Sequence, residues 1–329
     1  MKKIYNTISI KGKSRDEWLE LRKQGIGGSD VGTILGLNPY KSSYELWGEK
    51  VGIYTPAKIE SPAMFWGNRL EPVVRDVMKY YEDDATSELS MQKTIKNFTE
   101  GKVKNKIRYV KAYMYRSVKH PYMLANVDGF IYIGGHRGIL EVKTINSWVK
   151  KQFEGGIPPY HLVQLQHYLY VLGDDFGLLG SLADGRDLEV MRFNRDEDLI
   201  EKIVRAEEVF WDTVVRAKDG LKRGLIEDKL PHPPIDESPA TERFFREKFE
   251  DVGGVIDGDE TLWELGKQYK KYKEEGKVLN TKVQKIKNEI IHIMGKKKGN
   301  TVDFGKNGKI VWKKYKEGGN RVFRVNVSF

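Results

Sequence analysis

The sequence predicts an α/β protein in which helices flank a mixed central sheet. Apolar residues recur every three or four positions in several segments, and they alternate with polar residues in the middle of the chain. The first spacing is that of a helix and the second that of a strand. A glycine-containing turn, GGHRG, also joins two alternating segments, which favours a hairpin. With 329 residues the chain can bury a full core without disulfides or structural metals.

The first third of the chain is predicted to be mainly helical. Ser14 and Glu17 have the spacing of a capping box, which would begin the first helix. A glycine-rich segment follows, in which Ser29 and Asp30 could cap a short helix. Periodicity and caps together predict helices over residues 14–24, 31–35, 44–51 and 66–81.

The middle of the chain is predicted to hold the sheet. Alternating segments predict strands over residues 111–116, 123–124, 129–133, 138–144, 178–182 and 188–193, with helices over 160–172 and 196–221. On the strand after the GGHRG turn, Ile139, Glu141 and Lys143 share one face, and Leu140 and Val142 share the other.

The C-terminal part is predicted to be an extension. A proline-rich segment, residues 228–241, suggests a boundary between a core of residues 1–240 and an extension of residues 241–329. The extension begins with a heptad-like helix from Leu262 to Ile293 and ends with two short strands, a β-hairpin, over residues 301–313 and 321–327. A heptad stripe needs a partner helix, which could be another subunit or the helix over residues 196–221.

Charge is distributed unevenly along the chain. Residues 264–329 hold 18 Lys/Arg against 6 Asp/Glu, whereas residues 1–263 hold 39 against 41. A basic segment gains affinity for a polyanion such as DNA by releasing counterions, but it also fits an ordinary solvated face. The chain has no cysteine, which excludes disulfides, cysteine zinc sites and cysteine-ligated iron–sulfur clusters. The sequence shows no apolar run long enough for a membrane span and no signal peptide, so a cytoplasmic location is expected.

Acidic side chains and a lysine are predicted to meet at one sheet edge. Asp128 precedes one strand, and Glu141 and Lys143 lie on one face of the next. Mg²⁺ prefers hard oxygen ligands, so this arrangement suits metal-assisted phosphodiester hydrolysis. The same pattern also fits a hairpin with a surface Glu–Lys pair.

Several sequence blocks resemble one nuclease family. The spacing D-x₁₂-E-x-K resembles that of the PD-(D/E)xK nucleases. The blocks WLELRKQGIGGSDVGTILGLNPY, WGNRLEPVVRDVM, HPYMLANVDG with GILEVKT, and PPYHLVQLQHYLYVLG resemble, in order, those of the lambda-type phage exonucleases of the YqaJ viral recombinase family. The resemblance implies a restriction-endonuclease-like core.

The resemblance also implies roles for individual residues. Asp128, Glu141 and the Val142 carbonyl would bind Mg²⁺ as two ions, with Mn²⁺ able to substitute. Lys143, Glu71 and Gln164 would complete the catalytic set. Arg22 and Ser29 would receive a DNA 5′-phosphate, for which a guanidinium and a hydroxyl at a helix N-terminus are suitable groups.

The function implied is a 5′-to-3′ exonuclease acting on double-stranded DNA ends. Its 3′ overhang would serve a single-strand annealing partner, and the protein would assemble as a trimeric ring in a bacterial host cell carrying a phage or prophage. Two alternatives remain open from the residues: a structure- or sequence-specific endonuclease of the same superfamily, and a non-catalytic DNA-binding protein.

Overall fold

The computed structural model describes residues 3–56, 61–82, 87–146, 158–249, 257–297, 299–313 and 322–327. The chain divides into two compact units, Met1–Glu250 and Asp251–Phe329. The dividing point lies ten residues after the sequence-based boundary because helix α9 (Pro239–Lys248) packs within the first unit, where Phe244 contacts Tyr54 with ring centres 4.7 Å apart. Within the described residues, no helix is both long and apolar enough to cross a membrane.

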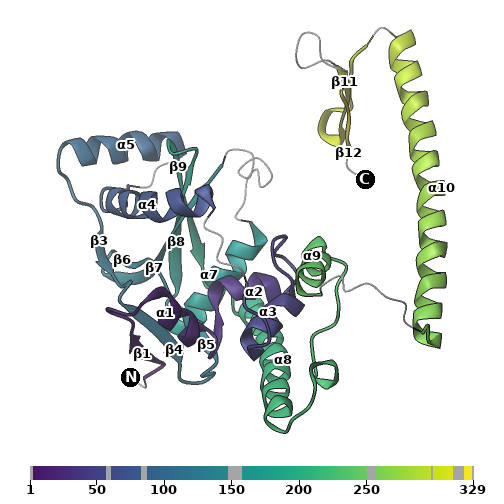
Figure 1. Cartoon of the computed structure of the whole chain (residues 1–329). Helices are drawn as coiled ribbons and strands as arrows, with labels where there is room; N and C mark the ends of the chain where they lie inside the picture. Colours follow the sequence, from purple (N-terminus) through teal and green to yellow (C-terminus); the bar gives the residue numbers. More distant parts are fainter. Residues whose placement is uncertain are drawn as a thin grey trace. The chain divides into compact units, whose positions relative to one another are not determined.

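Helices cover both faces of the central sheet of the first unit (Figure 1). Its strand order is β3-β6-β7-β8-β9, antiparallel except for the parallel pair β7–β8. The strands are β3 (Lys106–Tyr109), β6 (Gly129–Ile133), β7 (His136–Ile145), β8 (Phe176–Ala183) and β9 (Asp187–Asn194). A smaller sheet has the order β1-β4-β5-β2 and consists of β1 (Tyr5–Ser9), β4 (Tyr113–Ser117), β5 (Met123–Ala125) and β2 (Ile26–Gly27).

The two faces of strand β7 pack against different helices, as its alternation predicted. Ile139 belongs to a core cluster with residues of α7 (Pro159–Leu172). Leu140 and Val142 belong to a second cluster with residues of α4 (Pro62–Val77). A third cluster joins α2 (Gly28–Ile34), α3 (Ser43–Val51), α7 and the long helix α8 (Glu197–Lys222). The α/β fold with a mixed central sheet is therefore confirmed.

Local signals placed α3 well, but α4 begins and ends four residues before the helix predicted over residues 66–81. Helix α1 (Arg15–Arg22) begins with the predicted capping box, in which Ser14 Oγ accepts from Glu17 N–H at 3.2 Å and Glu17 Oε2 accepts from Ser14 N–H at 2.7 Å. The expected start of the next helix was wrong. Helix α2 begins at Gly28, and Asp30 caps it from inside its first turn by accepting from the Gly27 N–H at 2.9 Å.

Besides β2, β3 and α9, two elements of the first unit were not predicted. Helix α5 (Ser87–Thr99) follows α4 in the chain, and strand β1 pairs antiparallel with β4 more than 100 residues away. The proline-rich segment contains a short 3₁₀ turn (Glu227–Lys229) before α9 begins.

The second unit contains helix α10 (Glu260–Lys296) and a small antiparallel sheet. The helix extends slightly beyond the predicted heptad stripe at both ends. The predicted C-terminal β-hairpin is extended by a third strand, because the segment over residues 301–313 divides at a 3₁₀ turn (Gly305–Asn307). The strands are β10 (Thr301–Asp303), β11 (Gly308–Lys313) and β12 (Val322–Val327).

Candidate active site

Asp128, Glu141 and Lys143 lie together where strands β6 and β7 pair. Asp128 immediately precedes β6, and Gly129 pairs with Leu140 in the antiparallel register. The Asp128 Oδ2 atom accepts from the Val142 N–H at 2.9 Å, so this carboxylate is fixed against β7. The backbone of Val142 therefore positions Asp128. Its carbonyl as a metal ligand remains a prediction.

The Glu141 carboxylate is the centre of the site. It is 3% exposed, and its Oε1 atom accepts from Lys143 Nζ at 2.7 Å and from Gln164 Nε2 at 2.9 Å. Its buried Oε2 atom has no hydrogen-bond partner among the described residues. Gln164 comes from helix α7, so the structure brings together all four of these predicted residues, Asp128, Glu141, Lys143 and Gln164.

Crowded carboxylates shift the pKa values of the site. Burial, together with the nearby charges of Glu141 and Glu71, raises the pKa of Asp128 well above its usual value. Burial acts to lower the pKa of Lys143, but Glu141 and Asp128 outweigh it and raise that pKa. Repulsion between carboxylates and an unpartnered buried oxygen are both relieved when a cation binds, so the donor set fits a divalent metal ion.

Glu71 lies beside this centre and is held by two basic residues. Its Oε1 atom is 3.1 Å from Arg75 Nη1, and its Oε2 atom is 2.5 Å from Lys111 Nζ. Arg75 Nη1 also lies 3.4 Å from the Asp128 carbonyl oxygen, and its guanidinium stands 4.6 Å above the Tyr109 ring. Glu71 therefore contributes negative charge to the site, but both of its carboxylate oxygens are already paired with the side chains of Arg75 and Lys111. Among the described residues, no group of three or more acidic or histidine side chains lies close enough together to coordinate a metal ion without rearrangement.

Arg22 and Ser29 also contact each other, with Arg22 Nη2 donating to Ser29 Oγ at 3.1 Å. The same Nη2 atom is 3.0 Å from Asp30 Oδ1, and the other Asp30 oxygen is 2.8 Å from Lys50 Nζ. Burial acts to raise the pKa of Asp30, yet Arg22 and Lys50 hold it well below its usual range. The predicted phosphate site thus contains a permanent carboxylate.

A pocket of about 610 Å³ opens over this cluster. Its charged lining residues are evenly balanced, with Arg22, Lys23, Lys41 and Lys50 against Asp16, Glu20, Asp30 and Glu49. Because Asp30 is already neutralised by Arg22 and Lys50, the pocket can accept an anion only through the remaining basic donors.

Glycines in the GIGGSD segment allow close contact with α7. A Cβ on Gly28 would lie 2.4 Å from the Tyr168 ring and 3.0 Å from Gln164 Cγ, and a Cβ on Gly27 would lie 2.5 Å from Arg22 Nη2. Gln164 Nε2 also donates to the Tyr168 hydroxyl at 3.2 Å. Gln164, Tyr168 and Gly28 therefore connect the carboxylate cluster to the Arg22 cluster without an intervening layer.

Sequence reasoning missed several residues of the site. His161, one turn before Gln164, has a pKa lowered to about 3 by burial and by Lys143, so it stays neutral. Burial and Glu141 raise the pKa of Tyr168 well above its usual value. The positions of His161, Gln164 and Tyr168, three and four residues apart, put them on one helix face, which was the available signal. Arg75 could have been found in the same way, because it follows Glu71 by four residues and therefore lies on the same face of α4. Nothing local indicated Lys50 or Lys111.

His167 and Glu207 form a buried polar pair next to the site. His167 Nδ1 is 2.7 Å from Glu207 Oε1, and His167 Nε2 is 2.9 Å from the Leu124 carbonyl oxygen. Both side chains are fully buried. The pair ties α7 to α8 and to strand β5, so it fixes the position of the helix that carries Gln164.

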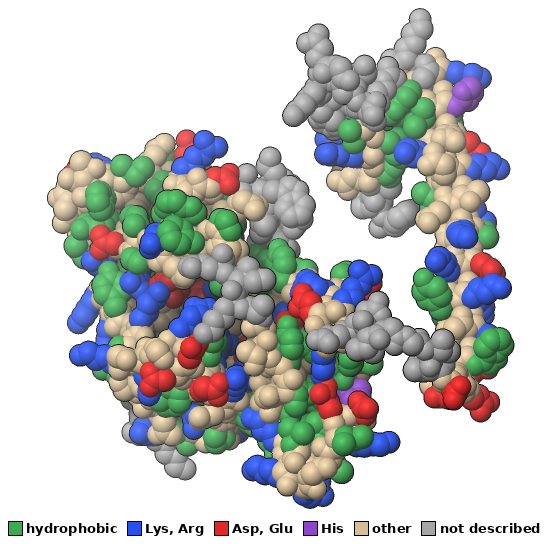
Figure 2. All heavy atoms as spheres, viewed as in Figure 1, with side chains coloured by type: hydrophobic (Ala, Val, Ile, Leu, Met, Phe, Trp, Pro, Cys, Tyr) green, Lys and Arg blue, Asp and Glu red, His purple; other side chains and the backbone are tan. Residues whose placement is uncertain are grey.

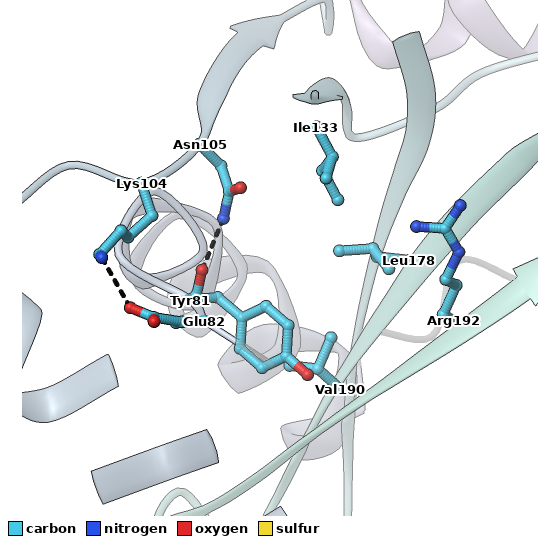
Figure 3. A pocket seen from close by; sticks show the side chains of 8 residues that line it. All are labelled: Tyr81, Glu82, Lys104, Asn105, Ile133, Leu178, Val190 and Arg192. Atoms are coloured by element: carbon cyan, nitrogen blue, oxygen red, sulfur yellow. Dashed lines mark hydrogen bonds and ion pairs between the residues drawn. The ribbon is translucent and has the colours of Figure 1, made fainter. Parts of the chain in front are cut away.

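A second pocket, of about 280 Å³, lies on another part of the first unit (Figure 3). Its polar groups largely satisfy one another, since Lys104 Nζ is 2.8 Å from Glu82 Oε2 and Asn105 Nδ2 donates to the Tyr81 carbonyl at 2.7 Å. It contains none of the predicted site residues, so we assign it no part in catalysis.

A family model and a curated relative both point to one family. The family model of the YqaJ-like viral recombinase domain matches residues 17–175. The chain is 32% identical over 286 residues to the uncharacterized protein YqaJ of Bacillus subtilis (strain 168), covering 85% of this chain and 78% of the relative. Protein D345L of African swine fever virus (strain Badajoz 1971 Vero-adapted) is 36% identical over 66 residues, 20% of this chain and 19% of the relative.

The chain also resembles solved structures at low sequence identity. The alkaline exonuclease LHK-Exo of Laribacter hongkongensis, in complex with dAMP, has a TM-score of 0.47 and 20% identity to this chain. The matched region covers 64% of this chain and 97% of LHK-Exo.

Proposed function

Because this chain belongs to the YqaJ-like viral recombinase family, as its sequence blocks predicted, we propose that it is a Mg²⁺-dependent exonuclease. Its substrate is the end of a DNA duplex, from which it digests one strand in the 5′-to-3′ direction. The observation that carries the proposal is the Glu141 carboxylate, which accepts from both Lys143 and Gln164 beside an Asp128 fixed by the Val142 N–H.

Each residue has a distinct task in this proposal. Asp128, Glu141 and the Val142 carbonyl would hold the metal, which when bound polarises the scissile phosphate and lowers the pKa of a water molecule. Gln164 holds the Glu141 carboxylate in place from α7. Lys143 Nζ lies 2.7 Å from Glu141 Oε1, where its ammonium would stabilise negative charge on the phosphate or orient the attacking water. Glu71 adds a carboxylate at the edge of the site once Arg75 or Lys111 releases it.

The 5′-to-3′ direction of digestion would be set by the Arg22 cluster, which consists of Arg22, Ser29, Asp30 and Lys50. Among the described residues, the guanidinium contacts with Ser29 and Asp30 both use Nη2, so its other donors are the ones that would bind a 5′-phosphate. A pocket for a strand end is useful to an exonuclease and useless for internal cutting. The 3′ overhang left by the reaction would be the substrate of a single-strand annealing protein in the bacterial cytoplasm, and assembly as a trimeric ring is part of the same proposal.

The decisive experiment compares linear duplex DNA with covalently closed duplex DNA in the presence of Mg²⁺ or Mn²⁺. The proposal expects digestion of the linear form only, with loss of a 5′ label before a 3′ label. Cutting of the closed form would favour the endonuclease alternative. Binding without cutting of either form would favour the non-catalytic one.

A further inference from the structure

Helix α10 carries an apolar seam that its own unit leaves largely uncovered. Ten positions, alternately three and four residues apart, form this α10 seam: Leu262, Leu265, Tyr269, Tyr272, Gly276, Leu279, Val283, Ile286, Ile290 and Ile293. Eight of these side chains are 51–67% exposed. A strict 3.5-residue repeat over five heptads is typical of a two-stranded coiled coil and uncommon in a helix that lies on a globular core.

The small sheet of the second unit occupies a flank of the helix and leaves the seam open. Met294 is 2% exposed, and Lys287 Nζ stands 5.6 Å from the centre of the Phe323 ring. Both residues lie beside the seam, near the C-terminal end of α10. Figure 2 shows apolar side chains still exposed along the helix between its lysines.

Helix α8, the other candidate partner from the sequence, has its own apolar stripe already buried. Within the first unit, the stripe packs into one core cluster with α2, α3 and α7, through Ile203, Phe210, Val214 and Ala217. This helix therefore offers no matching seam to α10.

We propose that the α10 seam pairs with the α10 seam of a second copy of this chain in antiparallel orientation. The centre of the pair puts Gly276 of each helix opposite Leu279 of the other. All ten seam positions then find partners, with Leu262 opposite Ile293, Leu265 opposite Ile290, Tyr269 opposite Ile286, and Tyr272 opposite Val283.

The flanking charges select this orientation. Antiparallel helices bring Glu275 of each copy beside Lys282 of the other, which forms two ion pairs across the seam. The remaining flanking pairs contain no like charges. A parallel pair would instead bring Lys282 beside Lys287 of the other copy twice.

Register is selected by the same residues. Sliding one antiparallel helix by a heptad in one direction puts Glu275 beside its own copy, and in the other direction puts it beside Glu289. Side-chain size agrees with the charges, because Gly276 makes room for the larger Leu279. Parallel helices would set glycine against glycine and leave a gap.

The first test measures the mass of the full-length protein in solution by light scattering. Ile286→Glu puts a charge in the seam and should lower the particle mass, to one half where two monomers or two trimeric rings are joined through α10 alone. Asn288→Glu adds the same charge on the outer face of the helix and should leave the mass unchanged. An unchanged mass for Ile286→Glu would overturn the proposal.

The second test uses the charge pair. Lys282→Glu should raise the dissociation constant of the pair about threefold to tenfold. Adding Glu275→Lys to the same chain should restore it, because the two ion pairs re-form with reversed signs. Tighter association of Lys282→Glu alone would indicate the parallel arrangement and overturn the antiparallel one.

The third test exploits the absence of natural cysteine. Chains carrying Leu262→Cys and chains carrying Ile293→Cys should form a mixed disulfide when combined and oxidised, and neither should cross-link alone. Cross-linking of each chain with itself would show parallel helices. No cross-link in any mixture would show that the seam is covered by something else, such as the first unit or a different protein. None of these measurements involves DNA, so they stand apart from the proposed nuclease activity.

Discussion

The two units of this chain handle charge in opposite ways. The first unit buries charged groups in fixed pairs, including Glu141, Asp30 with Lys50, and Glu207 with His167. On α10 of the second unit, nine lysines and five glutamates are exposed except for the half-buried Lys287. A buried charge needs a specific partner within the fold, whereas most exposed charges contribute together to the attraction for a polyanion. Single substitutions should therefore have large effects in the first unit and graded effects in the second.

The largest expected effect tests whether the chemistry belongs to the first unit alone. Asp128→Ala or Glu141→Ala should lower the cleavage rate at least about a hundredfold, because each removes a proposed metal ligand. Lys143→Ala should do the same by removing the ammonium. The rate is measured on a labelled linear duplex, with DNA binding measured in Ca²⁺.

A control separates this loss from unfolding. Glu201→Ala removes an exposed carboxylate on α8 and should change neither activity nor melting temperature. Residual activity of more than a few per cent in the site variants would place the metal site elsewhere.

The next effect sharpens the comparison by asking whether end recognition also lies in the first unit. Arg22→Ala should slow digestion of 5′-phosphorylated duplex by about tenfold to a hundredfold, since it removes a charge-assisted contact worth roughly 1.5–3 kcal/mol. Digestion of the 5′-hydroxyl duplex should change little. Arg205→Ala, on the exposed face of α8, is the matched control. Equal losses on both substrates would make Arg22 a structural residue.

A moderate effect is expected from removing the second unit. A chain ending at residue 250 should still cleave short duplexes at low salt but should digest long DNA less processively. Its binding should depend less on salt, because each lost phosphate contact reduces the log–log slope by about 0.9.

The full-length Ile286→Glu variant helps to interpret the truncation, since it keeps every lysine but lacks a continuous seam. If it behaves like the truncated chain, helix pairing and not charge supports processivity. Aggregation or a much lower melting temperature of the truncated chain would instead show that the second unit is needed for stability.

The smallest effect concerns stability and pH. Because the pKa of Asp128 is raised in the fold, its ionised form is disfavoured there, and stability falls as pH rises through that raised pKa. Asp128→Asn should therefore raise the melting temperature of metal-free protein by a few degrees, about 2–4 °C per kcal/mol for a domain of this size, at pH 8. The difference should vanish at acidic pH, where Asp128 is protonated. A difference in melting temperature between Asp128→Asn and the unaltered chain that does not change with pH would contradict the charge crowding described for the site.

Local patterns predicted the elements that local interactions determine. The Ser14 capping box, the period of α8 and the alternation through Glu141 and Lys143 each depend on residues a few positions apart. The pairing of strands β1 and β4 could not be predicted in this way, because the two strands meet across more than 100 residues.

The same limit applies to the site. Asp128 and Glu141 were visible because a hairpin brings them together. The role of Arg75 depends on the Asp128 carbonyl more than 50 residues away, and that of Lys50 depends on Asp30 in another helix. Phe244 shows the converse case. The proline-rich segment suggested a boundary near residue 240, whereas α9, which carries Phe244 against Tyr54, lies within the first compact unit.

One helix, α7, contacts both the carboxylate cluster and the Arg22 cluster that the proposed reaction would use. On this helix, Gln164 donates a hydrogen bond to Glu141 and the Tyr168 ring packs against Gly28. His167 is hydrogen-bonded to Glu207. A rigid element shared by the end-binding pocket and the cleaving carboxylates sets a constant spacing between them. On the proposed function, that spacing would determine the size of the fragment released at each cut, so products of uniform length would follow from the geometry of a single helix.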